Sequence, residues 1–109
     1  MASKKYDFVL TETAGADIDD IFGYISKDLV NPDAASDFAD ELEEKLYGVC
    51  KAPRSGHLVE NEFMRRDDIR RVLVGNFTAY YVIDEEKKSI VVLRVVYSKR
   101  DQGKILKDL

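Results

Sequence analysis

Positively charged side chains stand at both ends of one stretch of this chain, from Ile69 to Asp101. The stretch opens with the pair Arg70 and Arg71 and closes with Arg94, Lys99 and Arg100. If the residues between them fold as a β-meander, the two groups can meet on one surface. Clustered guanidinium and ammonium groups suit an anionic protein surface or a nucleic acid. The pattern therefore predicts a basic binding face.

Other catalytic chemistry is scarce. The chain has one histidine, His57, and one cysteine, Cys50, and it lacks a P-loop, a dinucleotide fingerprint, a paired CxxC and an HExxH motif. His57 stands in a predicted loop, which favours a surface role, and Cys50 lies on an apolar helical stripe, which favours a buried structural thiol. We predict no metal and no cofactor. A lone cysteine forms no internal disulfide, which fits a reducing cytoplasm.

Charge is divided unevenly along the 109 residues. The net charge is −4, but residues 1–49 hold 4 basic and 12 acidic side chains, whereas the remainder carries a net +4. The two halves either neutralise each other within one fold or present opposite surfaces. A pI near 5.0 argues against a protein that simply coats RNA or DNA. No apolar run approaches the roughly 18–20 residues that span a bilayer, so we expect no membrane association.

The N-terminal half predicts two amphipathic helices. Apolar residues recur in steps of three and four from Thr13 to Leu29, after a cap at Thr11 or Thr13. Asn31-Pro32 is typical of a helix start, and the second helix is expected to end near Cys50. A short connection makes the pair an antiparallel hairpin. Asp17, Asp19, Asp20 and Asp28 then form a solvated face, because no histidine or cysteine is near enough to complete a metal site.

The strand pattern completes an α+β fold in a single domain, residues 1–109. Tyr6 to Leu10 predicts an N-terminal strand, and the tail from Gln102 to Leu109 predicts a last helical turn with Ile105, Leu106 and Leu109 facing inward. The meander strands are Ile69–Val74, Phe77–Asp84 and Ile90–Tyr97. We expect the hairpin to pack on an antiparallel sheet of about four strands. Arg94 interrupts an apolar strand, which favours a structural ion pair over a ligand contact.

In this order, the elements resemble the RelE/ParE superfamily of toxins from bacterial type II toxin–antitoxin, or plasmid stabilisation, modules. The matching pieces are LTETAGADIDDIFGYIS, NPDAASDFADELEEKL, AP with a following Gly, IRRVLVGNFTAYYVID and VVLRVVYSKRD. They cover nearly the whole chain. The resemblance implies a cognate antitoxin whose extended or helical tail wraps the toxin. An exposed sheet edge and the groove of the helical hairpin are the two surfaces that such a tail would use.

Two activities are known in the family that this chain resembles. RelE-like members cleave ribosome-bound mRNA, whereas ParE-like members inhibit DNA gyrase without a nuclease centre. Arg71 and Arg100 match basic positions of the RNases, as candidate phosphate-binding or target-contact residues. Thr78 stands where the RelE pattern has an arginine, and Leu106 where it has a tyrosine. These departures favour the ParE-like activity, with the mRNA endoribonuclease as the alternative and a non-toxic or decayed interaction domain as the second.

Overall fold

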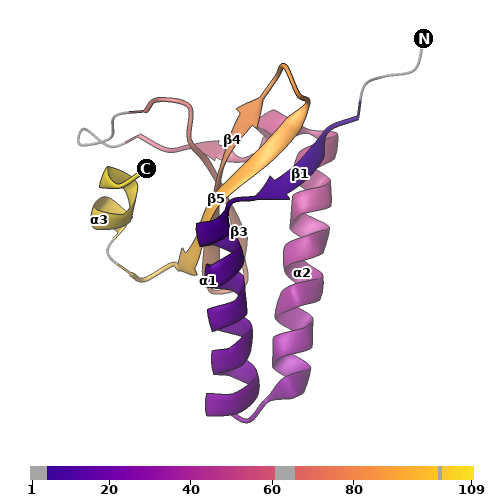
Figure 1. Cartoon of the computed structure of the whole chain (residues 1–109), viewed down its shortest axis with the longest axis vertical. Helices are drawn as coiled ribbons and strands as arrows, with labels where there is room; N and C mark the ends of the chain where they lie inside the picture. The colour runs from indigo at the N-terminus through magenta and orange to yellow at the C-terminus, as the bar shows by residue number, and fades with distance from the viewer. Residues whose placement is uncertain (1–4, 61–65, 101) are drawn as a thin grey trace.

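The computed structural model describes residues 5–60, 66–100 and 102–109 (Figure 1). Each predicted helix and strand is present, with boundaries shifted by a few residues at most, except in the first helix. In chain order the elements are β1 (Asp7–Leu10), α1 (Glu12–Gly23), the π-helix η1 (Tyr24–Asp28), α2 (Pro32–Lys51), the 3₁₀ turn η2 (Pro53–Ser55), β2 (His57–Leu58), β3 (Arg70–Val74), β4 (Phe77–Asp84), β5 (Ser89–Tyr97) and α3 (Gln102–Lys107).

Within the described residues, five strands form one sheet in the order β1-β5-β4-β3-β2. Strands β3, β4 and β5 pair antiparallel, as expected, with a bulge between Tyr80 and Tyr81 where β4 lies beside β5. The short strand β2, which was not predicted, pairs antiparallel with β3. The α+β class is confirmed, but the sheet is mixed, because β1 runs parallel to β5. A parallel pair needs a long connection between its strands. Here the whole hairpin and the rest of the sheet provide that connection.

The helical hairpin covers one face of the sheet, and α3 lies on the other side of it (Figure 1). Helix α2 begins as predicted, with the Asn31 side chain accepting a hydrogen bond from the Ala34 N–H and Pro32 in the first turn. Its apolar stripe enters a core shared with α1 and the sheet. The fully or nearly buried members of that core are Ala14, Ile25, Ala35, Phe38, Leu42, Leu46, Val74, Ala79, Val92 and Val95.

The first helix is not one continuous α-helix up to Leu29. Thr11 caps its start by accepting from the Ala14 N–H, but after Gly23 the chain continues as a π-helix, in which the Leu29 N–H donates to the Tyr24 carbonyl. The Ser26 hydroxyl donates to the Phe22 carbonyl at 2.8 Å. Such a side-chain bond competes with the regular helical ladder, which gives a local reason for the wider turn.

The predicted inward packing of the tail is confirmed. Ile105 and Leu106 are buried, and Leu109 packs against their cluster. Helix α3 thereby covers the second face of the sheet, where its partners include Ile69, Tyr80, Val82 and Val96. No helix in the described part of the chain is long and apolar enough to cross a membrane.

Arg94 forms the structural ion pair that its position in β5 predicted. Its guanidinium donates two hydrogen bonds to the Asp17 carboxylate, Nε–Oδ2 at 2.7 Å and Nη2–Oδ1 at 3.1 Å. Asp17 also accepts the Val95 backbone N–H at 3.0 Å. The expectation that Asp17 belongs to a solvated face is therefore wrong. Its side chain is only 14% exposed, because α1 places it against the edge of β5 beyond the end of β1.

A second long-range contact holds the chain between α2 and β3. The Tyr81 hydroxyl donates to the Pro53 carbonyl at 2.8 Å and accepts the Gly56 N–H at 3.0 Å. Gly56 lies so close to the Tyr81 ring that a Cβ there would overlap the hydroxyl and approach the Arg71 carbonyl oxygen to 2.8 Å. Only glycine fits at this point, and β2 begins at the next residue.

Replacing Asp17 with asparagine should lower the free energy of unfolding by about 2–4 kcal/mol, because the neutral amide leaves the half-buried Arg94 charge without its partner. Urea unfolding followed by circular dichroism measures this loss. The control is Asp68→Asn, which breaks an exposed bidentate pair with Arg66 and should cost less than about 1 kcal/mol. Equal losses in the two variants would contradict the structural role of Asp17.

Two glycine-to-alanine changes should alter the free energy of unfolding in opposite directions. Gly56→Ala forces a methyl group against Tyr81 and should destabilise the fold by about 1–3 kcal/mol. Gly48→Ala fills open space in the last turn of α2, with no atom within 4 Å of the new Cβ, and should stabilise the fold by about 0.5–1 kcal/mol. Thermal unfolding of both variants tests the pair, and a Gly56→Ala protein as stable as Gly48→Ala would disprove the close approach.

Candidate functional site

Three polar side chains form a row across the sheet on the face that carries α3. His57 of β2 is paired with Arg71 of β3, and Arg71 with Tyr80 of β4. Directly opposed residues of an antiparallel ladder project to the same face. Tyr80 packs in the cluster beneath α3, which identifies that face. His57 and Arg71 are exposed and Tyr80 is buried, so the row runs from solvent at the sheet edge to the base of α3.

The five cations grouped toward the two ends of the meander, Arg70, Arg71, Arg94, Lys99 and Arg100, do not act alike. Arg70 donates to the backbone carbonyls of Arg54 at 3.2 Å and Gly56 at 2.9 Å, and Arg94 is held by Asp17. The side chains of Arg70 and Arg94 therefore have structural roles. The side chains of Arg71, Lys99 and Arg100 are exposed, and no hydrogen bond or ion pair engages them in the described residues. These three remain available for an external anion.

Tyr80 connects the sheet to the turn that carries Arg100. Its hydroxyl donates to the Gln102 side-chain carbonyl, and the Gln102 amide donates to the carbonyls of Tyr97, Ser98 and Arg100 at 3.2, 3.0 and 3.0 Å. Arg71 and the Arg100 turn thus flank one phenol. Burial raises the pKa of Tyr80, and the nearby positive charge of Arg71 only partly opposes this. At neutral pH the phenol is protonated, so it donates a hydrogen bond and is no general base.

The two positions that depart from the RelE pattern are both inside the protein. Thr78 is 3% exposed, and its hydroxyl shares a hydrogen bond of 2.7 Å with the Ser98 hydroxyl. Leu106 is 4% exposed and packs from α3 against the sheet. A charged or phenolic group is therefore absent from both positions, and the residues found there stabilise the fold.

His57 is a second residue that sequence reasoning placed incorrectly. It was expected in a loop, but it begins β2 and lies beside Arg71. Its expected exposure is confirmed. A strand of two residues has no periodicity to detect. The only available signal was the pair Pro53 and Gly56, which turns the chain back toward the sheet.

Other chemistry is limited in the described residues. No group of three or more His, Cys, Asp or Glu side chains could hold a metal ion there. Cys50 is half-buried, and burial, together with the negative charge of Asp7, raises the pKa of its thiol. A protonated thiol is a poor nucleophile. The predicted full burial of Cys50 is wrong, because it is only partly buried against the cluster of Val49, Tyr81 and Ile90, although a structural role remains consistent with these surroundings.

Comparison with known proteins gives one family. The sequence model of the ParE toxin of the type II toxin–antitoxin system parDE matches residues 8–102. A search of curated protein sequences finds no match.

Solved structures share the fold at low sequence identity. A chain of the chromosomal ParDE system from P. aeruginosa is 20% identical, with a TM-score of 0.68, covering 86% of this chain and 97% of that one. A chain of the RelBE2 toxin–antitoxin complex from Mycobacterium tuberculosis is 21% identical, with a TM-score of 0.61, covering 86% and 99%. The isolated E. coli RelE toxin is 16% identical, with a TM-score of 0.56, covering 92% of each chain.

The family model spans β1 to the start of α3, so it includes the helical hairpin and the row that contains Arg71. The order of strand, hairpin and meander, the basic face and this match agree: the chain belongs to the ParE toxin family of type II toxin–antitoxin systems.

Proposed function

We propose that residues 1–109 act as one ParE-like toxin domain, which stops growth by binding and inhibiting DNA gyrase. The toxin is kept silent in the cytoplasm by a cognate antitoxin. Arg71 and Arg100 contact the target, with Lys99 beside them in the same turn. The family match supports a type II toxin, and the gyrase target is our inference from the chemistry of the site.

The observation that carries this proposal is the composition of the exposed sheet face. Arg71, Lys99 and Arg100 offer three positive charges without internal partners in the described residues. The tyrosine between them, Tyr80, is protonated and already donates to Gln102. Such a surface binds acidic groups well, but its tyrosine is no general base. Binding without cleavage is the simplest activity that it supports.

The antitoxin is proposed from the same comparisons. The similar structures are described as a ParDE system and as a RelBE2 toxin–antitoxin complex. A partner that covers the toxin would explain why several large apolar side chains are exposed in this chain, among them Val9, Leu10, Leu29, Val30 and Leu73. Contiguous exposed apolar surface marks interaction sites in soluble proteins.

Changing Arg71 and Arg100 together to alanine should abolish growth inhibition while the fold stays intact, because exposed arginines contribute little to stability. The experiment expresses each variant from a tightly repressed promoter in bacteria and follows optical density, with unfolding curves of the purified proteins beside it. Arg54→Ala is the matched control: this arginine is also exposed, but its side chain is already paired with Glu85. Full toxicity of the double variant would reject the proposed contact residues.

A second candidate is the mRNA endoribonuclease, and one observation favours it. The His57 imidazole lies next to Arg71 in the sheet, so a proton-transfer group and a phosphate-binding group share one edge. The third possibility, a non-toxic or decayed interaction domain, predicts unimpaired growth when soluble wild-type protein is expressed alone.

Two assays on purified protein should separate the two toxic mechanisms. We expect inhibition of gyrase supercoiling, and primer extension on ribosome-bound mRNA should show no cuts. His57→Gln should leave toxicity unchanged, because gyrase inhibition needs no proton transfer. Codon-spaced cuts that disappear in His57→Gln, with supercoiling untouched, would establish the ribonuclease instead.

A further inference from the structure

Lys99 and Arg100 project from a short turn after β5, and hydrogen bonds hold this turn against its neighbours. The Ser98 N–H donates to the Asn76 carbonyl at 2.8 Å. The Ser98 hydroxyl shares its 2.7 Å hydrogen bond with the hydroxyl of Thr78 in β4. The backbone just before the two cations is therefore fixed both to β4 and to the turn that precedes β4.

Gln102 holds the same turn from the start of α3. Its side-chain nitrogen lies 3.2, 3.0 and 3.0 Å from the carbonyl oxygens of Tyr97, Ser98 and Arg100. A side-chain amide has only two N–H groups, so the three carbonyls share them. One half-buried side chain thus fixes the backbone from which both Lys99 and Arg100 project.

The oxygen of the same Gln102 side chain connects this turn to Arg71. It accepts the hydroxyl of Tyr80, which is the direct cross-strand neighbour of Arg71. Burial raises the pKa of the Tyr80 phenol and the charge of Arg71 partly opposes this, so the guanidinium acts on the hydroxyl that binds Gln102. The Tyr80 ring is 1% exposed and cannot move freely. Two side chains therefore set the distance between Arg71 and the turn.

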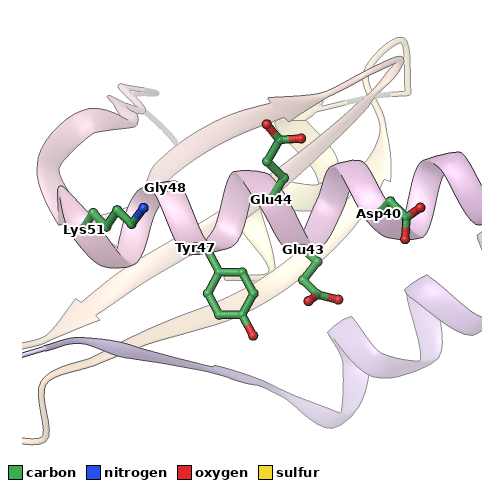
Figure 2. A pocket seen from close by; sticks show the side chains of 6 residues that line it. All are labelled: Asp40, Glu43, Glu44, Tyr47, Gly48 and Lys51. Atoms are coloured by element: carbon green, nitrogen blue, oxygen red, sulfur yellow. The ribbon is translucent and has the colours of Figure 1, made fainter.

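The acidic surface of α2 shows no such restraint. Figure 2 shows Asp40, Glu43 and Glu44 projecting from α2 around a shallow hollow of about 560 Å³. Within the described residues, no hydrogen bond or ion pair engages these three carboxylates. Charged side chains on the outer face of an amphipathic helix are ordinarily solvated in this way. Hydrogen bonds from a half-buried side chain thus distinguish the turn at Lys99 and Arg100 from charge that is only exposed.

We infer that Gln102 is a positioning residue for target binding, which holds the Lys99–Arg100 turn at a fixed distance from Arg71. The inference rests on the proposed function, and Gln102 acts through its neighbours without touching the target. Lysine and arginine side chains lose conformational freedom when they bind, and a fixed backbone beneath them limits that loss. Without Gln102 the three cations remain, but their spacing is no longer defined.

Gln102→Met removes every hydrogen bond of this side chain and keeps a neutral group of similar length. The concentration of purified protein that half-inhibits gyrase supercoiling should rise about five- to tenfold, the loss expected for ordinary hydrogen bonds. Tyr81→Phe is the matched control, because it also removes side-chain hydrogen bonds to a turn, at Pro53 and Gly56. This control should stay within about twofold of wild type. Equal inhibition by wild type and Gln102→Met would overturn the inference.

Tyr80→Phe tests the connection to Arg71 by itself. The phenyl ring keeps its packing beneath α3, and only the hydroxyl that donates to Gln102 is lost. The half-inhibiting concentration should rise about threefold, less than in Gln102→Met, because the amide still binds the three carbonyls of the turn. A Tyr80→Phe protein that inhibits as strongly as wild type would show that the spacing from Arg71 is not used, and would overturn the inference.

A double-mutant cycle separates positioning from a general loss of stability. In an Arg100→Ala background, the further loss caused by Gln102→Met should shrink to about twofold, because a cation that Gln102 positions is gone. In a Tyr81→Phe background, the full loss should remain. Equal losses in the two backgrounds would identify an ordinary structural role for Gln102 and reject positioning.

A measurement without gyrase keeps this inference distinct from the proposed function. The Arg100 N–H donates to the Tyr97 carbonyl at 3.0 Å, so its hydrogen exchange, followed by NMR, reports whether the turn is held. Exchange should be about tenfold faster in Gln102→Met and unchanged in Tyr81→Phe. Unchanged exchange in Gln102→Met would overturn the inference. Wild-type protein that leaves supercoiling untouched would instead reject the proposed function, whatever the exchange rates show of the turn.

Discussion

The Asp17 carboxylate is the contact on which the arrangement of the two layers depends. Strand β1 is short and ends at Leu10, so the outer edge of β5 has no strand partner beyond Val92. The start of α1 replaces that partner with side chains: the Thr11 hydroxyl donates to the Leu93 carbonyl at 3.1 Å, and Asp17 accepts from the Val95 N–H. The same carboxylate neutralises Arg94. Asp17 thus pairs with both a backbone N–H and a charged side chain, and it fixes α1 against β5.

Much of the fold was readable from the sequence, because its signals are local. The Asn31-Pro32 start of α2 and the strand Phe77–Asp84 follow from capping and alternation, and both are observed. The parallel pairing of β1 with β5 was not predicted, since nothing local encodes which strand a distant segment joins. The π-helix was not predicted either. Its apolar positions keep nearly α-helical spacing, and the change from α-helix to π-helix depends on one hydrogen bond, from the Ser26 hydroxyl to the Phe22 carbonyl.

The sequence predicted that the site is basic, but not which residues form it or what each of them contacts. Counting charges located the basic segment, but it could not show which of the cationic side chains are held by hydrogen bonds or ion pairs within the protein. Arg70 binds carbonyls that reach it only through the turn after α2, and Arg94 was assigned an ion pair without its partner. Asp17 was grouped with its neighbours on a solvated face, since helical spacing does not reveal where a strand ends. His57 joined the row because two residues of the connection add to the sheet edge.

The division of charge also makes the molecule an electric dipole. The acidic residues 1–49 form β1 and the hairpin, whereas the net-positive remainder supplies the other strands and α3. In an external field such a molecule experiences a torque, so it rotates before it collides. Its basic pole turns toward polyanions and its acidic pole toward cations. Two partners of opposite sign can therefore approach from opposite directions, each oriented by the same permanent moment and each slowed by added salt.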